Sequence, residues 1–435
     1  MNKISEITGD IKICIHRGAN QIGGSCVEIE CEGQRLIIDV GTPLDIENEE
    51  DIDESVLPDI KGIKESDSSI IGILISHPHK DHYGLIKYVS PEIPVYIGKK
   101  ADEIIETFSL FVPKYAINIQ NKKYFESGES FVLGKTSHGD IRVTPFLVDH
   151  SAFDSYSFLI EIGGKKILYS GDFRCHGRKG KLSENLSKNN LLKNLDIVLL
   201  EGSSLSRLDE NSQFPKEEEI EDKFVEELKK TKGLAIVHCS SQNIDRLVSV
   251  YHACCRTGRK MIVDLYQACV LRACFEMERP LFKNAALYVP ENQRVFIKEK
   301  QLFDLMHEYS KPRIYRENIL KNMEKFALIF RATHIRDFNY APELLKNARF
   351  FYSMWNGYWN DECKNYKQVR DFVRKNNLEK IDIHTSGHAS IIDLKKYIEN
   401  LGSPLVTPIH TFHPEKFPDF FKNVKIHQDG EWFTV

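Results

Sequence analysis

The chain has 435 residues, of which 41% are hydrophobic and 28% charged, as in globular proteins with room for two or three domains. Its formal net charge of −4 excludes a general attraction for nucleic acid, so any such binding requires a local basic or metal-bearing region. The sequence has no signal-peptide pattern, no apolar stretch of the roughly 20 residues that span a bilayer, and no CxxC pair among its ten cysteines. We therefore expect a cytoplasmic protein with reduced thiols and no membrane segment.

Short β-rich segments separated by glycine turns dominate the first half of the chain. We expect strands at 11–18, 25–33, 35–41, 68–76, 93–98, 123–133, 141–149, 156–164, 165–172 and 195–203, and helices at 80–89 and 100–112. From residue 215 onward, helices and strands alternate, which favours a mostly parallel sheet covered by helices. The expected helices there are 215–232, 242–258, 266–278, a polar stretch over 291–325, and 361–377; the expected strands are 233–240, 260–265, 325–332 and 349–355.

After residue 380 the pattern of the first half returns. We expect a helix at 391–402, a strand at 404–410 and a terminal pair of strands within 424–435. This order predicts an α/β domain inserted into another domain. The expected division is a first domain over 1–203, the inserted domain over 204–380, and the return of the first domain over 381–435.

Residues 76–83 read SHPHKDHY and follow an apolar strand directly. In an extended segment, His77 and His79 face the same side, whereas Asp81 and His82 begin the next helix and serve a second point nearby. Imidazole and carboxylate groups are ligands suited to Zn²⁺. A solvated turn that happens to be rich in histidine is the alternative, but this spacing at the end of an apolar strand favours a metal site.

This HxHxDH motif resembles the metal motif of the metallo-β-lactamase fold, an αββα sandwich. The resemblance extends to Asp39 in RLIIDVG, His150 in LVDHSAFDS and Asp172 in LYSGDFR. It implies that Asp39 orients the site without binding metal, and that Asp172 bridges two ions. The implied ligand set for two Zn²⁺ per chain is His77, His79, His150 and Asp172 for one, and Asp81, His82, Asp172 and a late histidine for the other.

Three later segments resemble the β-CASP nucleases of this superfamily, which insert an α/β domain after the aspartate motif, and the bacterial ribonuclease J-like group most of all. They are DIVLLEGSS with Glu201, HTSGHAS with His388 and LVTPIH with His410. The resemblance implies that His410 completes the second zinc site and that Glu201 raises the pKa of His388, which acts on the scissile phosphate. With Asp81, these two form the implied catalytic set.

The implied reaction is the hydrolysis of RNA by a hydroxide held between two metal ions, as a 5′→3′ exonuclease, an endonuclease or both. The chain departs from ribonuclease J in reading PIHTFHPEKF where that enzyme has PVHGE, and it ends at Val435 soon after this motif. We therefore expect the additional C-terminal domain of ribonuclease J to be missing, which leaves both a monomer and a homodimer open.

Several segments are candidates for substrate binding. In HCSSQNIDR, Ser240 and Ser241 precede a helix and could hold a phosphate with Arg246, although ordinary helix capping by serine is the alternative. Ser386 and Ser390 flank His388, where ribonuclease J-like enzymes seat the 5′-monophosphate of RNA. The aromatic segment 351–359 could stack bases or belong to the core, and the basic segment 171–180 could steer nucleic acid or be merely solvated.

Other functions remain open. A DNA nuclease of the same family, acting for instance on single-stranded DNA, is the nearest alternative; His410 favours RNA because the eukaryotic DNA-directed members tend to have an apolar residue there. A small-molecule metallo-hydrolase is a second alternative, and the inserted domain argues against it. A non-catalytic binding subunit is a third, and the complete set of expected ligands argues against that.

Overall fold

The computed structural model describes residues 10–46, 51–205, 207, 209, 211–275 and 282–435. The chain divides into two compact units, Met1–Phe214 with Gly387–Val435 and Pro215–Ser386, which we call the sandwich unit and the inserted unit. The divisions thus fall after residues 214 and 386, whereas the sequence predicted them after residues 203 and 380.

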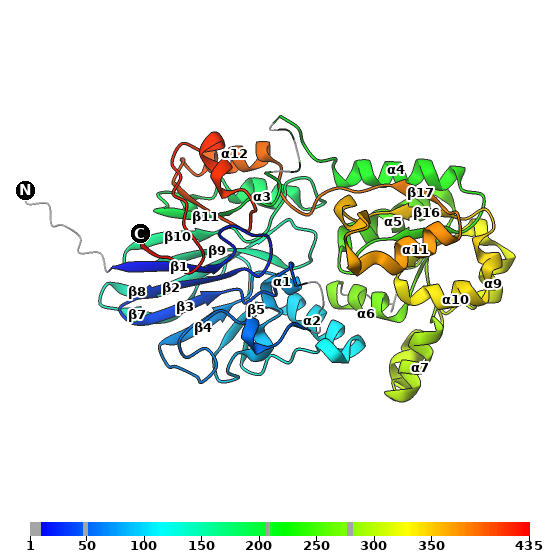
Figure 1. Ribbon diagram of the computed structural model, residues 1–435, viewed down its shortest axis with the longest axis horizontal. Helices are drawn as coiled ribbons and strands as arrows, with labels where there is room; N and C mark the ends of the chain where they lie inside the picture. The colour runs from blue at the N-terminus through cyan, green and yellow to red at the C-terminus, as the bar shows by residue number, and fades with distance from the viewer. Residues whose placement is uncertain (1–9, 47–50, 206, 208, 210, 276–281) are drawn as a thin grey trace, which may run out of the picture. The chain divides into compact units, whose positions relative to one another are not determined.

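The first sheet of the sandwich unit has seven strands in the order β19-β1-β2-β3-β4-β5-β6. Figure 1 labels β1 to β5 of this sheet. They are β1 (Ile11–Arg17), β2 (Cys26–Cys31), β3 (Gln34–Ile38), β4 (Ile70–Leu74), β5 (Val95–Gly98), β6 (Lys122–Phe125) and β19 (Trp432–Thr434). Strands β3 to β6 run parallel, so their carboxyl ends share one edge of the sheet. Strand β19 closes the other side by pairing antiparallel with β1.

The second sheet has six strands in the order β18-β11-β10-β9-β8-β7. They are β7 (Phe131–Thr136), β8 (Gly139–Val148), β9 (Ser155–Ile162), β10 (Lys165–Tyr169), β11 (Ile197–Glu201) and β18 (Leu405–Ile409). The predicted segment 123–133 is divided between the sheets, because β6 ends in the first sheet and β7 begins in the second. The predicted terminal pair is divided in the same way: Val424 bridges to Val406 of β18, whereas β19 joins β1.

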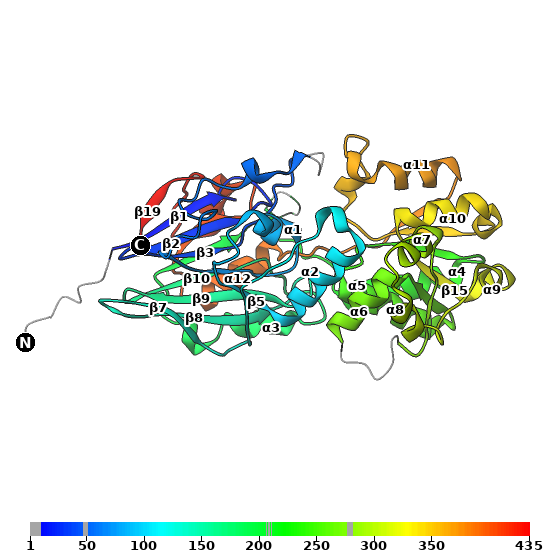
Figure 2. The same ribbon diagram turned by 90° about the horizontal axis from the view of Figure 1, so that it is seen from below.

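Apolar side chains from both sheets meet in one core, including Ile13 and Val27 from the first and Phe158 and Ile167 from the second. Helices cover the outer faces (Figure 2). They are α1 (Lys80–Tyr83), α2 (Lys99–Phe111), α3 (Gly180–Leu186), α12 (Ile391–Asn400) and α13 (Phe417–Phe420). Apolar residues of α2 pack in a cluster with the first sheet, and those of α3 and α12 pack with the second. These layers are the predicted αββα sandwich.

The inserted unit has a six-stranded sheet in the order β14-β13-β15-β12-β16-β17, and every described pairing in it is parallel, as predicted. Its strands are β12 (Ala235–His238), β13 (Lys260–Val263), β14 (Ala285–Leu287), β15 (Phe326–Phe330), β16 (Arg349–Tyr352) and β17 (Glu379–Asp382). Its helices are α4 (Glu217–Lys230), α5 (Ile244–Thr257), α6 (Leu265–Cys274), α7 (Glu291–Glu299), α8 (Phe303–Glu308), α9 (Arg316–Lys321), α10 (Ile335–Tyr340) and α11 (Lys367–Lys375).

Three helices of the inserted unit differ from expectation. The polar stretch 291–325 forms three short helices because Gln301, with a left-handed φ of 53°, ends the first and Pro312 precedes the third. Helix α11 begins only at Lys367, whereas the sequence predicted a start at residue 361. Helix α6 ends at Cys274, and residues 276–278 of the predicted helix lie outside the described residues. None of the described helices is long and apolar enough to cross a membrane.

Candidate metal centre

The residues of the predicted metal centre all follow the carboxyl ends of strands in the sandwich unit. His77 and His79 come after β4, and His150 comes after β8; Asp172 and His410 come after β10 and β18. In the second sheet, β10, β11 and β18 are parallel, and β8 runs in the same direction because both β8 and β10 are antiparallel to β9. The register of the two sheets therefore gathers side chains that are far apart in the sequence.

Three imidazoles form the first group of the centre. The ring centroids of His77, His79 and His150 lie 4.8 to 5.1 Å apart, and Nε2 of His150 is 3.3 Å from Nδ1 of His79. One nitrogen atom from each of the three lies within 4.8 Å of the others. This spacing allows one small cation to contact all three rings.

Asp172 joins this group to a second one. Its Oδ2 atom lies 3.7 Å from Nε2 of His77, 3.2 Å from Nε2 of His82 and 3.5 Å from Nε2 of His410. On the other side of the second group, Oδ2 of Asp81 lies 3.9 Å from both His82 and His410. The arrangement places Asp172 between the three imidazoles of the first group and the pair His82 and His410.

Asp39 is the hydrogen-bonding hub behind the histidines. It has no exposed surface, and its Oδ2 atom accepts hydrogen bonds from the hydroxyls of Ser76 and Tyr169, both at 2.7 Å, and lies 2.7 Å from Nδ1 of His82. The Ser76 hydroxyl also lies 3.0 Å from Nδ1 of His77. These bonds occupy the Nδ1 atoms and leave Nε2 of both histidines facing Asp172. The sequence pointed to Asp39 but not to Ser76 or Tyr169.

Two further contacts orient the remaining histidines. Nδ1 of His150 lies 2.6 Å from the carbonyl oxygen of Gly387, and Nδ1 of His410 lies 2.9 Å from the hydroxyl of Ser25. Asp39 and His410 also have left-handed backbones, with φ values of 60° and 50°. Side chains with a Cβ rarely adopt this conformation, and such strain concentrates at functional sites.

The segment that carries Asp81 and His82 is held by backbone contacts. The amides of Val40 and Thr42 donate to the carbonyls of His82 and Lys80, at 2.8 and 2.9 Å. A Cβ atom on Gly41 would lie 1.7 Å from the carbonyl oxygen of Asp81, so only glycine permits this approach. Gly41, the last residue of the RLIIDVG segment, therefore allows the close backbone contact that positions Asp81 and His82.

The donor set fits divalent metal ions. Burial, reinforced by the neighbouring histidines, lowers the pKa of both His77 and His150 well below the ordinary value, so their rings are neutral. Nε2 of His77 is buried and makes no hydrogen bond within the described part of the chain. Although burial raises the pKa of Asp172, the surrounding histidines, His410 foremost, hold it well below its usual range. Imidazole nitrogens beside a carboxylate are the ligand chemistry of zinc-type ions.

His388 and Glu201 form a pair beside Asp172. Nδ1 of His388 lies 3.3 Å from Oε2 of Glu201 and 3.9 Å from Oδ2 of Asp172. Glu201 is fully buried and accepts hydrogen bonds from the amides of Ser203 and Phe173. Burial alone lowers the pKa of His388, but the charges of Glu201 and Asp172 raise it above its ordinary value. The His388 side chain is 16% exposed, so a ligand can reach it.

The predicted substrate residues have mixed outcomes. Arg246 has no exposed surface; its guanidinium binds Glu217 at 2.8 Å and also contacts Ser353, so it supports the interior of the inserted unit. Ser390 is fully buried and caps α12, since its hydroxyl accepts from the amide of Asp393. Ser390 therefore has a local structural role, and its predicted phosphate contact stays a prediction.

The other serines are placed as follows. The hydroxyl of Ser241 is buried and accepts from Nε2 of Gln267 at 3.3 Å, whereas Ser240 is half-buried. Asn243, and neither serine, caps α5. Ser386 is 6% exposed. In the basic segment 171–180, Arg174 is fully buried, with Nε 3.4 Å from Oδ1 of Asp149, so it does not face solvent as a steering group would.

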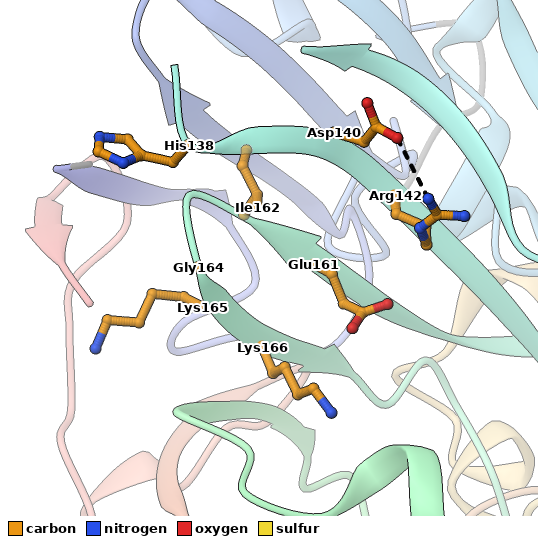
Figure 3. Close-up of a pocket in the computed structure, with 8 residues that line it drawn as sticks. All are labelled: His138, Asp140, Arg142, Glu161, Ile162, Gly164, Lys165 and Lys166. Atoms are coloured by element: carbon orange, nitrogen blue, oxygen red, sulfur yellow. Dashed lines mark hydrogen bonds and ion pairs between the residues drawn. The ribbon is translucent and has the colours of Figure 1, made fainter. Parts of the chain in front are cut away.

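A pocket of about 330 Å³ lies elsewhere on the sandwich unit (Figure 3). It is lined by His138, Asp140, Arg142, Glu161, Ile162, Gly164, Lys165 and Lys166. These residues lie at the amino ends of β8 and β10 and at the carboxyl end of β9, away from the ends of β8 and β10 that carry His150 and Asp172. Its charges also pair locally, with Arg142 3.3 Å from Asp140. The pocket is therefore not part of the metal centre.

Comparison with known proteins identifies the family of the sandwich unit. The model of the metallo-beta-lactamase superfamily matches residues 19–204, a range that contains every predicted site residue before the inserted unit. The match agrees with the predicted metallo-β-lactamase fold for this part of the chain. A crystal structure of a protein of unknown function from Enterococcus faecalis V583 superposes with a TM-score of 0.80 at 19% identity, covering 98% of this chain and 100% of that one. That likeness shows the fold alone.

Several proteins of similar sequence carry the name ribonuclease J. Ribonuclease J from Mycobacterium tuberculosis (strain CDC 1551 / Oshkosh) is 25% identical over 266 residues, which are 58% of this chain and 44% of that protein. Ribonuclease J from Helicobacter pylori (strain ATCC 700392 / 26695) is 26% identical over 264 residues, 58% of this chain and 36% of the relative. Ribonuclease J 2 from Streptococcus pyogenes serotype M3 is 25% identical over 287 residues, 64% and 50%. The chain thus matches half or less of each relative.

Proposed function

Residues 19–204 belong to the metallo-β-lactamase superfamily, and we propose that this chain is a zinc-dependent phosphodiesterase that cleaves RNA. The cleavage is 5′→3′ exonucleolytic, endonucleolytic or both. The relatives named ribonuclease J support RNA as the substrate. The observation that carries the proposal is the carboxylate of Asp172, which lies 3.2 to 3.7 Å from histidines of two adjacent donor sets.

Two zinc ions would be held by this chain. His77, His79, His150 and Asp172 would hold one, and Asp81, His82, Asp172 and His410 the other. When bound, such a pair lowers the pKa of water and offsets the negative charge of a phosphodiester. The side chains of Asp81 and His388 are 15% and 16% exposed, whereas His77, His82, His410 and Asp172 are 3% exposed or less. Substrate therefore reaches the centre beside Asp81 and His388.

His388 supplies the proton chemistry. The carboxylate of Glu201, 3.3 Å away, favours the charged imidazolium form of His388. In that form, the exposed ring can donate a hydrogen bond to a phosphoryl oxygen or a proton to the departing 3′ oxygen. Glu201 also accepts a hydrogen bond from the backbone amide of Phe173, the residue directly after Asp172. The same carboxylate therefore contacts both the segment that carries Asp172 and the ring of His388. The products would carry a 5′-phosphate and a 3′-hydroxyl.

The direct test is the incubation of purified protein with RNA and DNA strands of the same sequence, labelled at either end, with and without chelator. We expect cleavage of the RNA strand that the chelator abolishes, and the product ladder would give the polarity. Cleavage of DNA alone would favour the DNA nuclease. Resistance of both strands in the presence of added zinc would contradict the proposal.

A further inference from the structure

An ordered group of aromatic side chains follows β16 in the inserted unit. We define the aromatic platform as Tyr352, Trp355, Tyr358, Trp359 and Tyr366. The ring centroids of Trp355 and Tyr358 are 5.2 Å apart, those of Tyr358 and Tyr366 are 5.0 Å apart, and those of Tyr352 and Trp359 are 4.7 Å apart. The rings therefore form two contacting groups, one of Trp355, Tyr358 and Tyr366 and one of Tyr352 and Trp359.

The buried side chain of Arg370 holds the loop that carries the platform. This arginine is 1% exposed, and its guanidinium donates to the carbonyl oxygens of Tyr358, at 2.9 Å, and Cys363. The hydroxyl of Tyr352 donates to the carbonyl oxygen of Trp355 at 3.1 Å. A Cβ atom on Gly357 would lie 2.2 Å from the indole of Trp355, so the ring rests on that glycine. A ligand that binds here has little loop ordering to offset.

Trp355 is nevertheless 43% exposed. Tyr358, Trp359 and Tyr366 are partly exposed around it. A large aromatic side chain that is fixed by its surroundings and still open to solvent suits the stacking of a planar ligand. Of the two alternatives for the aromatic segment 351–359, core packing applies to Tyr352, which is fully buried, but not to Trp355.

The charge of the inserted unit indicates the ligand. Residues 215–386 contain 30 Lys and Arg against 24 Asp and Glu, whereas the rest of the chain contains 29 against 39. The inserted unit is therefore basic, although the net charge of the whole chain is −4. At the platform, exposed Lys364 and Lys367 flank Tyr366; of the two neighbouring carboxylates, that of Asp361 is paired with Arg374 at 2.7 Å and that of Glu362 is exposed. Nζ of Lys380 lies 4.8 Å from the ring centroids of Tyr352 and Trp359.

We propose that the aromatic platform binds single-stranded RNA, with bases stacked on Trp355 and Tyr358 and phosphates neutralised by Lys364 and Lys367. Positive charge beside exposed rings matches the alternation of phosphates and bases along a single strand, and bases paired in a duplex are not free to stack in this way. The inference rests on the proposed function for the choice of RNA, but the platform acts in binding and not in the cleavage step.

The experiment measures binding of the full chain to a labelled oligouridylate of about ten nucleotides, by fluorescence anisotropy with chelator present so that no cleavage occurs. Trp355→Ala should weaken binding about 10-fold, and Trp355→Phe should restore most of it. Lys364→Gln with Lys367→Gln should flatten the dependence of log affinity on log salt by about 1.4, which is about 0.7 for each lost phosphate contact. Trp432→Ala is the matched control, because this indole is 46% exposed but belongs to the sandwich unit.

The outcomes separate the two proposals. Affinity of Trp355→Ala equal to that of the unmodified chain, or an equal loss in Trp432→Ala, would overturn the platform while RNA cleavage stands. An equal loss of affinity for duplex RNA would overturn the stacking of bases. If the unmodified chain neither binds nor cleaves RNA, the proposed function fails and the platform with it. Unchanged circular dichroism of Trp355→Ala establishes that a loss of affinity is not a loss of fold.

Discussion

The carboxylate of Asp39 lies 2.7 Å from Nδ1 of His82, and neither side chain has exposed surface. This contact decides which nitrogen of the ring faces Asp172, because the other nitrogen is already engaged. The geometry of the centre therefore depends on a carboxylate that need not touch a metal ion.

Replacing Asp39 should weaken metal binding. We expect Asp39→Asn to lower metal affinity about 10- to 100-fold, because the amide no longer fixes His82 as a carboxylate does. The measurement is the metal retained after dialysis against increasing chelator, by elemental analysis. Asp154→Asn is the matched control, since Asp154 is also a buried carboxylate that accepts a tyrosine hydroxyl at 2.7 Å, from Tyr156. Equal metal loss in both variants would contradict the role of Asp39.

Removing His388 should separate binding from chemistry. His388→Ala should lower single-turnover cleavage of RNA about 10²- to 10⁴-fold, since it removes a proton donor, while affinity for RNA stays near that of the unmodified chain. Glu201→Gln keeps the ring but removes the charge that favours its protonated form, so its loss of rate should be smaller. Unchanged turnover of His388→Ala would refute the assigned role.

The metal content of the protein can be counted directly. Elemental analysis of the protein purified without chelator should approach two zinc ions per chain, as expected for two donor sets that share Asp172. A ligand at 100 times its dissociation constant adds about 2.7 kcal/mol to the free energy of unfolding, so removal of zinc should lower the melting temperature. A content of one ion or none would rule out the two-ion centre.

His238 should make the stability of the inserted unit depend on pH. Burial lowers its pKa from 6.5 to about 4. Above pH 6.5 the ring is neutral in both states and its contribution is constant; as the pH falls from 6.5 to about 4, the unfolded chain takes up a proton that the folded one does not. The free energy of unfolding should therefore fall by about 3 kcal/mol over this window.

The corresponding measurement is urea unfolding at several pH values for the unmodified chain and for His238→Phe. The ring of His238 packs among Phe330, Phe350 and Tyr352, so phenylalanine suits the site. The variant should show a shallower decline below pH 6.5, and parallel curves for the two proteins would contradict the burial of a neutral histidine.

Arg246 should matter for stability and not for substrate. Arg246→Met removes the charged partner of the fully buried Glu217, so we expect it to lower the free energy of unfolding by about 3 to 5 kcal/mol. Arg374→Met breaks the exposed pair with Asp361 and should cost less than about 1 kcal/mol. A variant at Arg246 that loses RNA affinity but no stability would restore the phosphate contact that the sequence predicted.

The sequence was informative about the metal centre because its chemistry demands particular residue types. Histidines two positions apart after an apolar strand, and an aspartate after another, are costly to bury without a cation, and the structure brings these side chains together. Their roles as ligands stay a prediction. Ser76, Tyr169 and Ser25 escaped notice because serine and tyrosine are common at strand ends, and their contacts arise only once the sheets are in register.

Residues near a helix start are difficult to assign from sequence, and the substrate roles of Ser390 and Arg246 stay predictions. A serine or arginine near a helix start serves local structure as readily as it serves a phosphate, and Ser390 and Arg246 both do so. The sequence predicts that α11 begins at residue 361, but it begins at Lys367. The guanidinium of Arg370 binds the carbonyl oxygens of Tyr358 and Cys363 and so keeps this segment out of the helix. Such tertiary contacts are not visible in a local pattern.

The wide separation of the metal ligands along the chain has a consequence for synthesis. His77 and Asp81 leave the ribosome early, whereas His410 follows only after the whole inserted unit has been made. The growing polypeptide therefore presents only part of the proposed donor set until His410 has been made, and a second ion could be held by the full set only after that point. If the proposed function holds, chains that do not yet include His410 would lack catalytic activity while they are still close to the RNA that is being translated.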